Sequence, residues 1–101
     1  MKELDRQLLI AAEAGDTEKV KDLINQGANV NAQGEDGMTA LHLACEGNHT
    51  ETALALFDMH AKTEIRDEEN KKPIQRAHFN NRTYKALLAA IQKEDRMIDY
   101  L

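Results

Sequence analysis

The sequence predicts an all-α solenoid built from short helix-turn-helix units that stack side by side. Its main sign is self-similarity at a period of about 33 residues, the mark of units too small to bury their own apolar faces. Three series keep this period: Leu8, Leu41 and Ile74, then Ala11, Ala44 and Ala77, then Thr17, Thr50 and Thr83. Aromatic residues make up 4% of the chain and Trp is absent, which favours small, closely packed helices over a sheet or a large ligand cavity. Stacked units of this kind imply a binding surface rather than a catalytic pocket.

Length and charge narrow the class of protein. A chain of 101 residues forms one domain and buries roughly 60 to 70% of the surface that its unfolded state exposes. The net charge is -5, whereas a nucleic-acid surface needs Lys and Arg gathered on one face. We therefore expect no nucleic acid among the partners.

The chain also lacks the apolar segments that mark membrane or secreted proteins. It has no run of about 18 apolar residues, no apolar stretch near Met1 that resembles a secretory signal, and a single Cys. We therefore expect no membrane contact, no internal disulfide and a cytoplasmic, intracellular protein, with unconventional export left open.

The first unit is predicted from its apolar periodicity. Residues 4–14 follow a helical period that ends at Gly15, as expected for a first helix. Residues 17–26 carry apolar residues on one face and charged residues on the other, so this second helix packs back against the first. Gly27 follows, where a left-handed residue closes a helix without a Cβ clash. Residues 28–38 are rich in Asn, Gly and Asp, which predicts a projecting loop, here called a finger.

The second and third units repeat this design with differences. In the second unit a helix over 39–45 precedes one that ends near His60, which takes the left-handed place of Gly27 at a cost of roughly 1 kcal/mol. In the third unit Pro73 suits a first helical turn, because its missing N–H would be unpaired there anyway. The last helix lacks a closing Gly, so it runs on or restarts through 92–101 as a C-terminal cap. Its apolar stripe is shifted from the repeat register: Tyr84, Leu87, Leu88 and Ile91.

Two runs of residues carry a resemblance to a known family. The run Asp36-Gly37-Met38-Thr39-Ala40-Leu41-His42-Leu43-Ala44 follows the run Gly27-Ala28-Asn29-Val30-Asn31-Ala32, and together they resemble the ankyrin repeat. The resemblance implies a single ankyrin-repeat domain over 1–101 whose fingers are β-hairpin loops. Its units are expected at about 1–33, which is of the N-terminal cap type, then about 34–66 and about 67–94, with a C-terminal helical cap over about 92–101.

Four His and one Cys raise the question of a metal or catalytic site. Cys45 occupies the second alanine of the repeat's first helix, a tightly packed position that favours core packing over chemistry. His42 matches the turn His of the repeat, and the resemblance implies a structural bond to Thr39. No phosphate loop, nucleophile elbow or calcium-loop spacing is present in the sequence. We expect no catalytic residue, no metal and no cofactor, and a protein that is not an enzyme.

The resemblance implies a non-catalytic protein-protein interaction module that binds a partner through its concave face and fingers, as a scaffold, adaptor or inhibitor. Carried over by position, the partner-binding candidates are Glu35, Asp36, Met38 and Glu46 in the second unit and Glu68, Glu69, Lys71, Phe79 and Asn80 in the third, with Glu13 and Ala14 extending the strip. Negative charge concentrates at 67–69, and Met38 and Phe79 are the expected apolar anchors. A partner with basic residues around an apolar patch fits this surface, although a solvated acidic loop explains the charges equally well.

The alternative function is structural self-assembly through apolar ends. Ile10 lies on the side of the first helix where an internal unit would meet a preceding neighbour, and Leu87 stands at the other end beside Tyr84 and Ile91. Exposed apolar side chains at both ends would join copies of the chain. We expect a monomer, and a homo-oligomer is the outcome that would favour this alternative.

Overall fold

The computed structural model describes the backbone of residues 1–99 and the side chains of residues 1–94. Within residues 1–99 the chain forms helices and turns and no β-strand. The helices are α1 (Glu3–Ala14), α2 (Thr17–Asn25), α3 (Ala40–Glu46), α4 (Thr50–Asp58), α5 (Pro73–Arg76) and α6 (Arg82–Asp99). The expected all-α solenoid of helix-turn-helix units is confirmed. None of the described helices is both long and apolar enough to cross a membrane.

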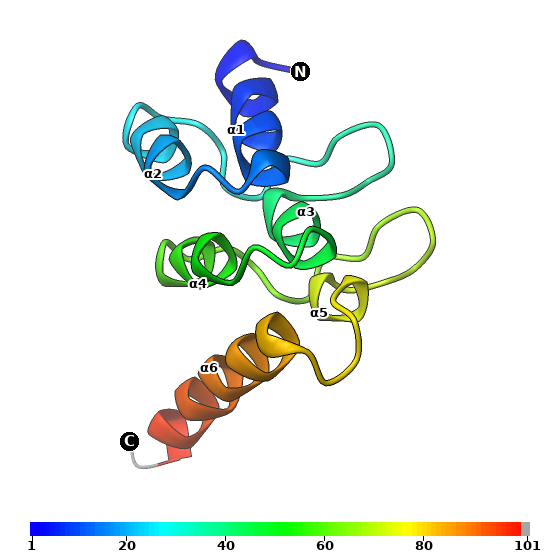
Figure 1. Ribbon diagram of the computed structural model, residues 1–101. Helices are drawn as coiled ribbons and strands as arrows, with labels where there is room; N and C mark the ends of the chain where they lie inside the picture. The colour runs from blue at the N-terminus through cyan, green and yellow to red at the C-terminus, as the bar shows by residue number, and fades with distance from the viewer. Residues whose placement is uncertain (100–101) are drawn as a thin grey trace.

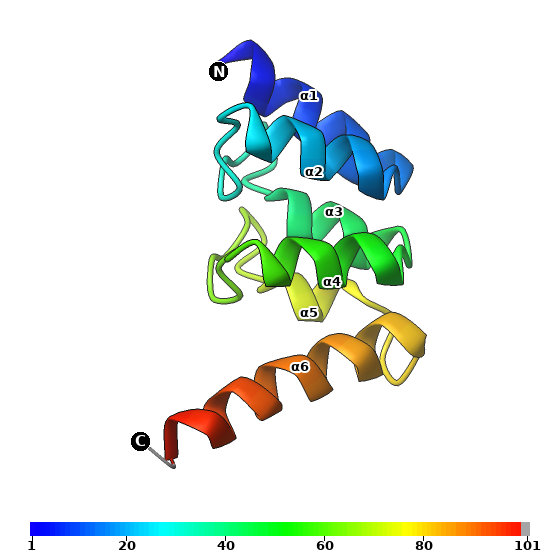
Figure 2. The same cartoon turned by 90° about the vertical axis from the view of Figure 1, so that its left-hand side faces the viewer.

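The helices form three stacked pairs, α1 with α2, α3 with α4 and α5 with α6 (Figure 1). Of these, α1, α3 and α5 form one row, and both fingers project from this row to the same side. The second row contains α2, α4 and α6, which Figure 2 shows in front of the first. We call the surface made by α1, α3, α5 and the fingers the inner face, and the surface made by α2, α4 and α6 the outer face.

An apolar spine runs the length of the stack between the two rows. Its largest members are fully buried leucines from successive units: Leu8, Leu41, Leu56 and Leu87. Between the inner helices the side chains are small, and the series Ala11, Ala44 and Ala77 is at most 7% exposed. Small side chains at these positions let neighbouring helices approach closely, so the predicted period reflects a shared core.

Local signals fix where the helices begin and end. The Asp16 carboxylate accepts a hydrogen bond from the Lys19 N–H at 3.2 Å and so caps the start of α2. Gly15 ends α1 in the left-handed conformation, with φ at 74°. The left-handed residues expected after α2 and α4 are confirmed, because φ is 109° at Gly27 and 71° at His60.

The third unit departs from the other two. α5 is a single turn of four residues that begins at Pro73 in the first helical position, as expected. α6 is continuous over 18 residues, so it passes residue 92 without a break. Residues 100–101 of the expected C-terminal cap lie outside the described residues.

The expectation that Leu87 is an exposed end residue is wrong, because its side chain is 0% exposed. The 33-residue register would place Ala86 against the core, but α6 turns so that the larger Leu87 side chain joins the buried cluster where α6 packs on α4. Tyr84 and Ile91 are partly buried against the same cluster. Ile10, at the other end, is 53% exposed.

The fingers are hairpin turns that stack on each other at residues 33–38 and 66–71. In each, one backbone N–H donates to the carbonyl four residues on at 3.0 Å: Gly34 to Met38 and Asp67 to Lys71. Between the fingers, the Glu68 N–H donates to the Asp36 carbonyl at 3.0 Å. Gly37 allows this contact, because its φ is 74° and a Cβ there would lie 3.0 Å from the Glu68 nitrogen.

Replacing Ala44 by Leu should lower the free energy of unfolding by about 1 to 3 kcal/mol, because Ala44 is 0% exposed between inner helices and overpacking strains its neighbours. Urea unfolding followed by circular dichroism measures the change. The matched control, Ala89→Leu on an exposed part of α6, should change the free energy by no more than about 0.5 kcal/mol. Equal unfolding midpoints for the two variants would show that Ala44 does not pack at a unit interface.

Candidate functional site

The inner face carries the residues expected to bind a partner. Those that are exposed come from both fingers, the end of α3 and the loop between α5 and α6: Glu35, Asp36, Glu46, Glu68, Glu69, Phe79 and Asn80. Lys71, at the end of the second finger, is half-buried. Figure 1 shows the fingers and the loop between α5 and α6 on the same side of the stack, while Figure 2 shows the fingers at one end of the inner helices and this loop at the other.

The expectation that Met38 is an exposed anchor is wrong, because its side chain is only 7% exposed. Met38 lies at the base of the first finger, directly before the Thr39 cap of α3. There its side chain lies beside Leu9 of α1 and Leu43 of α3. It forms the floor of a groove and does not project from the surface.

Phe79 is the most exposed large apolar side chain among the described residues, at 82%. It stands in the loop between α5 and α6, next to Asn80, whose φ is 66°. Its ring packs on Tyr84 with centroids 5.2 Å apart and planes tilted by 56°, a geometry that aromatic pairs favour. The Tyr84 ring thus supports an aromatic side chain that is open to solvent.

Arg76, the last residue of α5, was missed by the sequence reasoning, yet it organises the acidic finger. Its guanidinium contacts the Asp67 carboxylate at 2.7 Å, Glu69 at 2.9 Å and Glu46 at 3.6 Å. The one available signal was charge, since an arginine in a short helix follows an acidic loop in the sequence. Three carboxylates of the inner face therefore share one cation.

Asp67 is a structural residue of this cluster, with a side chain that is 0% exposed. Burial opposes its ionisation, but the hydrogen bond from Arg76 and those from the Lys71 and Glu69 N–H groups outweigh burial and lower the Asp67 pKa. The acidic segment 67–69 is thus no run of free carboxylates. Within it, Glu68 is exposed, and no ion pair of Glu68 is found among the described side chains.

His42 ties the second unit to the third, and its expected bond to Thr39 is confirmed. Its Nδ1 lies 2.8 Å from the Thr39 Oγ1 and accepts the Thr39 N–H at 3.1 Å, while Nε2 donates to the Lys71 carbonyl at 2.8 Å. This pattern fits a neutral ring with its proton on Nε2. Burial lowers the pKa of His42, although the bond to the Lys71 carbonyl and the nearby Asp67 charge oppose that effect.

The other candidate chemical groups also serve the packing. Cys45 is 0% exposed, and burial raises the pKa of its thiol to about 12. His49 donates from Nε2 to the Glu13 carbonyl at 2.9 Å, and its ring lies against Gly15, where a Cβ would clash. In the part of the chain that the structure describes, no three His, Cys, Asp or Glu side chains are grouped to hold a metal ion.

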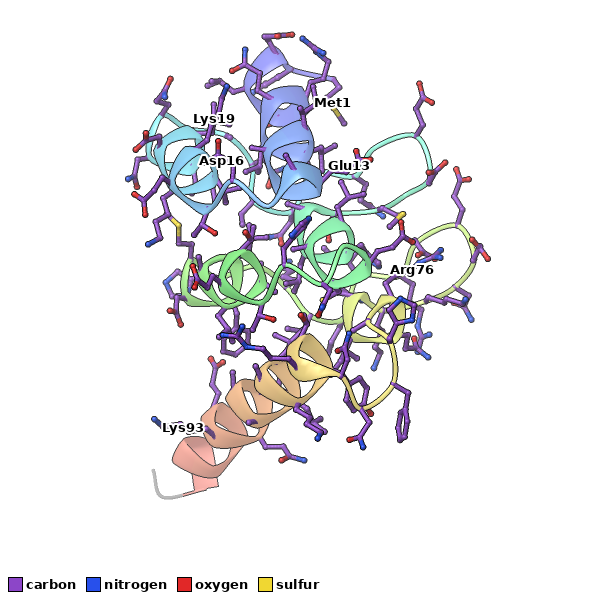
Figure 3. All side chains as sticks on the ribbon, viewed as in Figure 1. Met1, Glu13, Asp16, Lys19, Arg76 and Lys93 are labelled. Atoms are coloured by element: carbon purple, nitrogen blue, oxygen red, sulfur yellow. The ribbon has the colours of Figure 1, made fainter. Side chains whose placement is uncertain are left out.

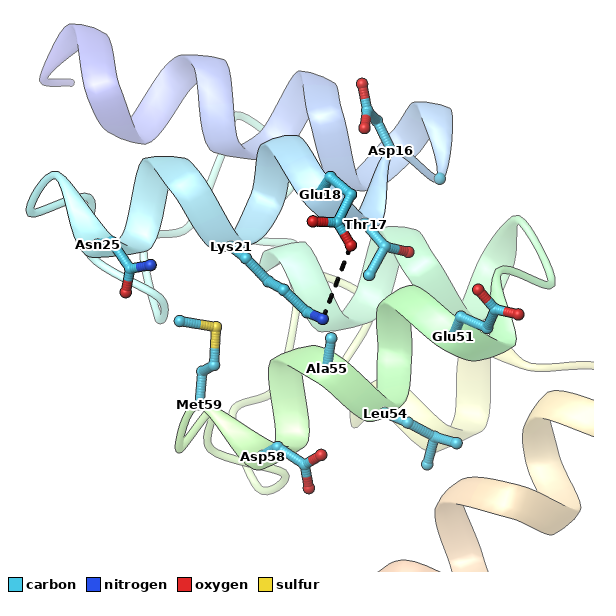
Figure 4. A pocket seen from close by; sticks show the side chains of 11 residues that line it. Asp16, Thr17, Glu18, Lys21, Asn25, Glu51, Leu54, Ala55, Asp58 and Met59 are labelled. Atoms are coloured by element: carbon cyan, nitrogen blue, oxygen red, sulfur yellow. Dashed lines mark ion pairs between the residues drawn. The ribbon is translucent and has the colours of Figure 1, made fainter.

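A hollow of about 730 Å³ lies on the outer face between α2 and α4 (Figure 4). Its lining mixes the carboxylates of Glu18, Glu51 and Asp58 with Leu54 and other apolar groups. The Lys21 ammonium lies 3.9 Å from the Glu18 carboxylate and points into the hollow. No deep or enclosed chamber of the kind a cofactor requires is formed by these residues.

A second hollow, of about 470 Å³, opens on the inner face between α1 and the first finger. We call it the α1 groove; its lining consists of Met1, Arg6, Leu9, Ile10, Glu13, Gly34, Glu35, Asp36, Met38 and Leu43. Figure 3 shows Met1 and Glu13 on the side of α1 that faces this finger. The groove has a largely apolar lining with carboxylates around it.

Stacked helix pairs, paired fingers and a His-bonded turn define a helical-repeat protein with an open surface. Residues 8–101 match the family described as ankyrin repeats (3 copies). The chain therefore belongs to the ankyrin-repeat family. Ankyrin repeats are generally protein-protein interaction modules and are generally not catalytic.

Among curated proteins, the chain is similar to ankyrin repeat domain-containing protein 40 of Mus musculus and of Homo sapiens. It is 37% identical to each over 75 residues, which are 73% of this chain and 21% and 20% of those proteins. It is also 37% identical over 73 residues to ankyrin repeat and KH domain-containing protein mask-1 of Caenorhabditis elegans, covering 72% of this chain and 3% of that protein. The chain thus spans about a fifth or less of the length of these relatives.

Changing Arg76 to Gln should lower the free energy of unfolding by about 3 kcal/mol or more, because it leaves the buried Asp67 carboxylate without its cation. Urea unfolding at neutral pH measures this. The double variant Arg76→Gln with Asp67→Asn should recover part of the loss, and Arg82→Gln at an exposed position is the matched control. An Arg76→Gln variant as stable as that control would rule out a structural role for the cluster.

Acidification should destabilise the fold through His42, whose pKa in the folded state lies below the ordinary value of about 6.5. The unfolded state then binds more protons, so stability is complete above about pH 6.5 and falls as the pH drops toward the folded-state pKa, by at most about 1.4 kcal/mol per pH unit. Urea unfolding from pH 7.5 to 5 measures the slope.

The control for this pH dependence is His42→Gln. The third unit offers the precedent, because the Gln75 Oε1 accepts the Lys72 N–H at 2.7 Å in the equivalent turn. The variant should show a shallower slope below pH 6.5, and an unchanged slope would mean that another group titrates.

Proposed function

We propose that this chain is a non-catalytic module that holds a protein partner against its inner face and acts as a scaffold, adaptor or inhibitor. The observation that carries the proposal is the coincidence on one face of an exposed aromatic side chain, Phe79, with exposed carboxylates on the stacked fingers. Aromatic anchors contribute strongly to interface energy, and rim charges steer association. The general role of ankyrin repeats supports the same conclusion.

The partner surface that fits is basic around an apolar patch. Glu46, Asp67 and Glu69 share the one positive charge of Arg76, whereas Glu35, Asp36 and Glu68 form no ion pair among the described side chains. These three side chains are exposed. A Lys or Arg side chain of the partner would meet them before any close contact forms.

The alternative, self-assembly through apolar ends, has less support than it had from the sequence. Leu87 is buried, so of the two expected contacts only Ile10 remains exposed. Exposed single apolar side chains are ordinary on protein surfaces. Sedimentation at two concentrations separates the candidates, since a dimer that persists on dilution would favour self-assembly.

Reversing the charge of Glu35, Asp36 and Glu68 to Lys should slow association with the natural partner by about tenfold or more at low salt, because these charges act on encounter. The measurement is affinity capture from the source cell, followed by association kinetics of the captured protein over a salt series. Phe79→Ala should instead speed dissociation.

The matched control reverses Glu18, Glu51 and Asp58 on the outer face and changes the net charge equally. It should leave capture and kinetics unchanged. A partner that the control variant loses and the inner-face variants keep would overturn the proposed function.

A further inference from the structure

We propose that the α1 groove is an anchor site for one bulky apolar side chain from a partner segment that carries Lys or Arg on both sides of it. The inference rests on the proposed function and deepens it, because it states where on the inner face the partner is held and by which chemistry.

The groove provides an apolar floor with room above it. Met38 is 7% exposed at the bottom, and the partly buried Leu9 and Leu43 flank it. Ile10 is 53% exposed at the wall. The volume of about 470 Å³ falls within the range of roughly 300 to 1,000 Å³ that is typical of protein pockets for small molecules.

Gly34 shapes one end of this space. A Cβ at Gly34 would lie 3.2 Å from the Leu9 Cδ1, so glycine lets the finger backbone approach α1. The Gly34 N–H is already bonded to the Met38 carbonyl at 3.0 Å. This N–H is therefore not free to bond to a ligand's backbone. The floor offers mainly apolar contact, which favours an apolar side chain as the anchor.

The carboxylates that line the groove favour positively charged residues on both sides of the anchor. Glu13, Glu35 and Asp36 are exposed, and none of them has an ion-pair partner within 4.0 Å among the described side chains. The one guanidinium in the lining, that of Arg6, is held by Glu3 at 2.6 Å. Among the side chains of the lining, the carboxylates therefore outnumber the cations that are free to pair with them.

No other described part of the inner face combines both features. In the third unit, Phe79 is 82% exposed, and the carboxylates near Arg76 already have its guanidinium within 4.0 Å. In the groove, an apolar hollow lies beside carboxylates that have no ion-pair partner among the described side chains. Complementarity therefore points to a basic segment with a single apolar side chain, whose charges pair with the rim while the anchor covers Met38.

The test uses a short fluorescein-labelled peptide with the central sequence Lys-Lys-Phe-Lys-Lys and the intact chain. Anisotropy at about 50 mM salt gives the affinity, and amide shifts of the isotope-labelled protein give the location. Binding should shift the amides of residues 9–13 and 34–38. A peptide with Ala in place of Phe should bind at least about tenfold more weakly.

Two protein variants with the same change in net charge complete the design. Glu13→Gln with Glu35→Gln and Asp36→Asn should weaken binding of the Phe peptide by about tenfold or more. Glu18→Gln with Glu51→Gln and Asp58→Asn, around the outer hollow, should change it by less than about twofold. Equal losses in both variants, shifts on the outer face, no binding, or a rise in protein mass that shows a second copy in the groove would each overturn the inference.

The natural partner separates this inference from the proposed function. If the groove variant keeps the partner while Phe79→Ala loses it, the groove is not the anchor site but the inner face remains the binding surface. If only the outer-face variant loses the partner, both proposals fail.

Discussion

The approach of neighbouring units at Ala44 is the constraint on which the rest of this protein depends. Ala44 has no exposed surface, and its counterparts Ala11 and Ala77 are nearly as buried. Each helix pair is too small to form a core of its own, so it is stable only while the next pair covers it. The positions of the fingers follow, because each finger leaves the stack where one unit meets the next.

Hydrogen bonds between the units add direction to this packing. The Thr50 and Thr83 hydroxyls lie 2.7 Å apart, as do those of Thr17 and Thr52. His42 donates to the Lys71 carbonyl between the second and third units. Buried polar groups must find partners, so these contacts hold one register between the units and set where the acidic fingers lie relative to the groove.

The sequence was sufficient for the repeating parts of the fold. Apolar period, the glycine after α2 and the left-handed His60 are local signals, and the structure has each of them. The burial of Leu87 was not predicted, because whether Leu87 or Ala86 faces the core depends on how α6 packs on α4. The burial of Met38 was not predicted either, because it depends on the position of α1, which the repeat period alone does not determine.

The candidate site was predictable as a face and less so in its electrostatics. Asp67 and its neighbours read as a free acidic run, since nothing local shows that Arg76 folds back onto them. Whether the exposed residues bind a partner is a property of that partner as well. The position of a residue in the repeat predicts whether its side chain lies on the binding face. Only the folded structure shows which of these side chains are already paired with another residue of the chain.

The backbone hydrogen bond from the Glu68 N–H to the Asp36 carbonyl reduces the conformational entropy that the fingers lose when a ligand binds. Two separate loops would each surrender conformational freedom when a ligand ordered them, and that loss would subtract from affinity. Here the loops are tied to each other before any encounter, with Gly37 making the tie possible. A ligand that touches one tip meets a surface whose other tip is already in place.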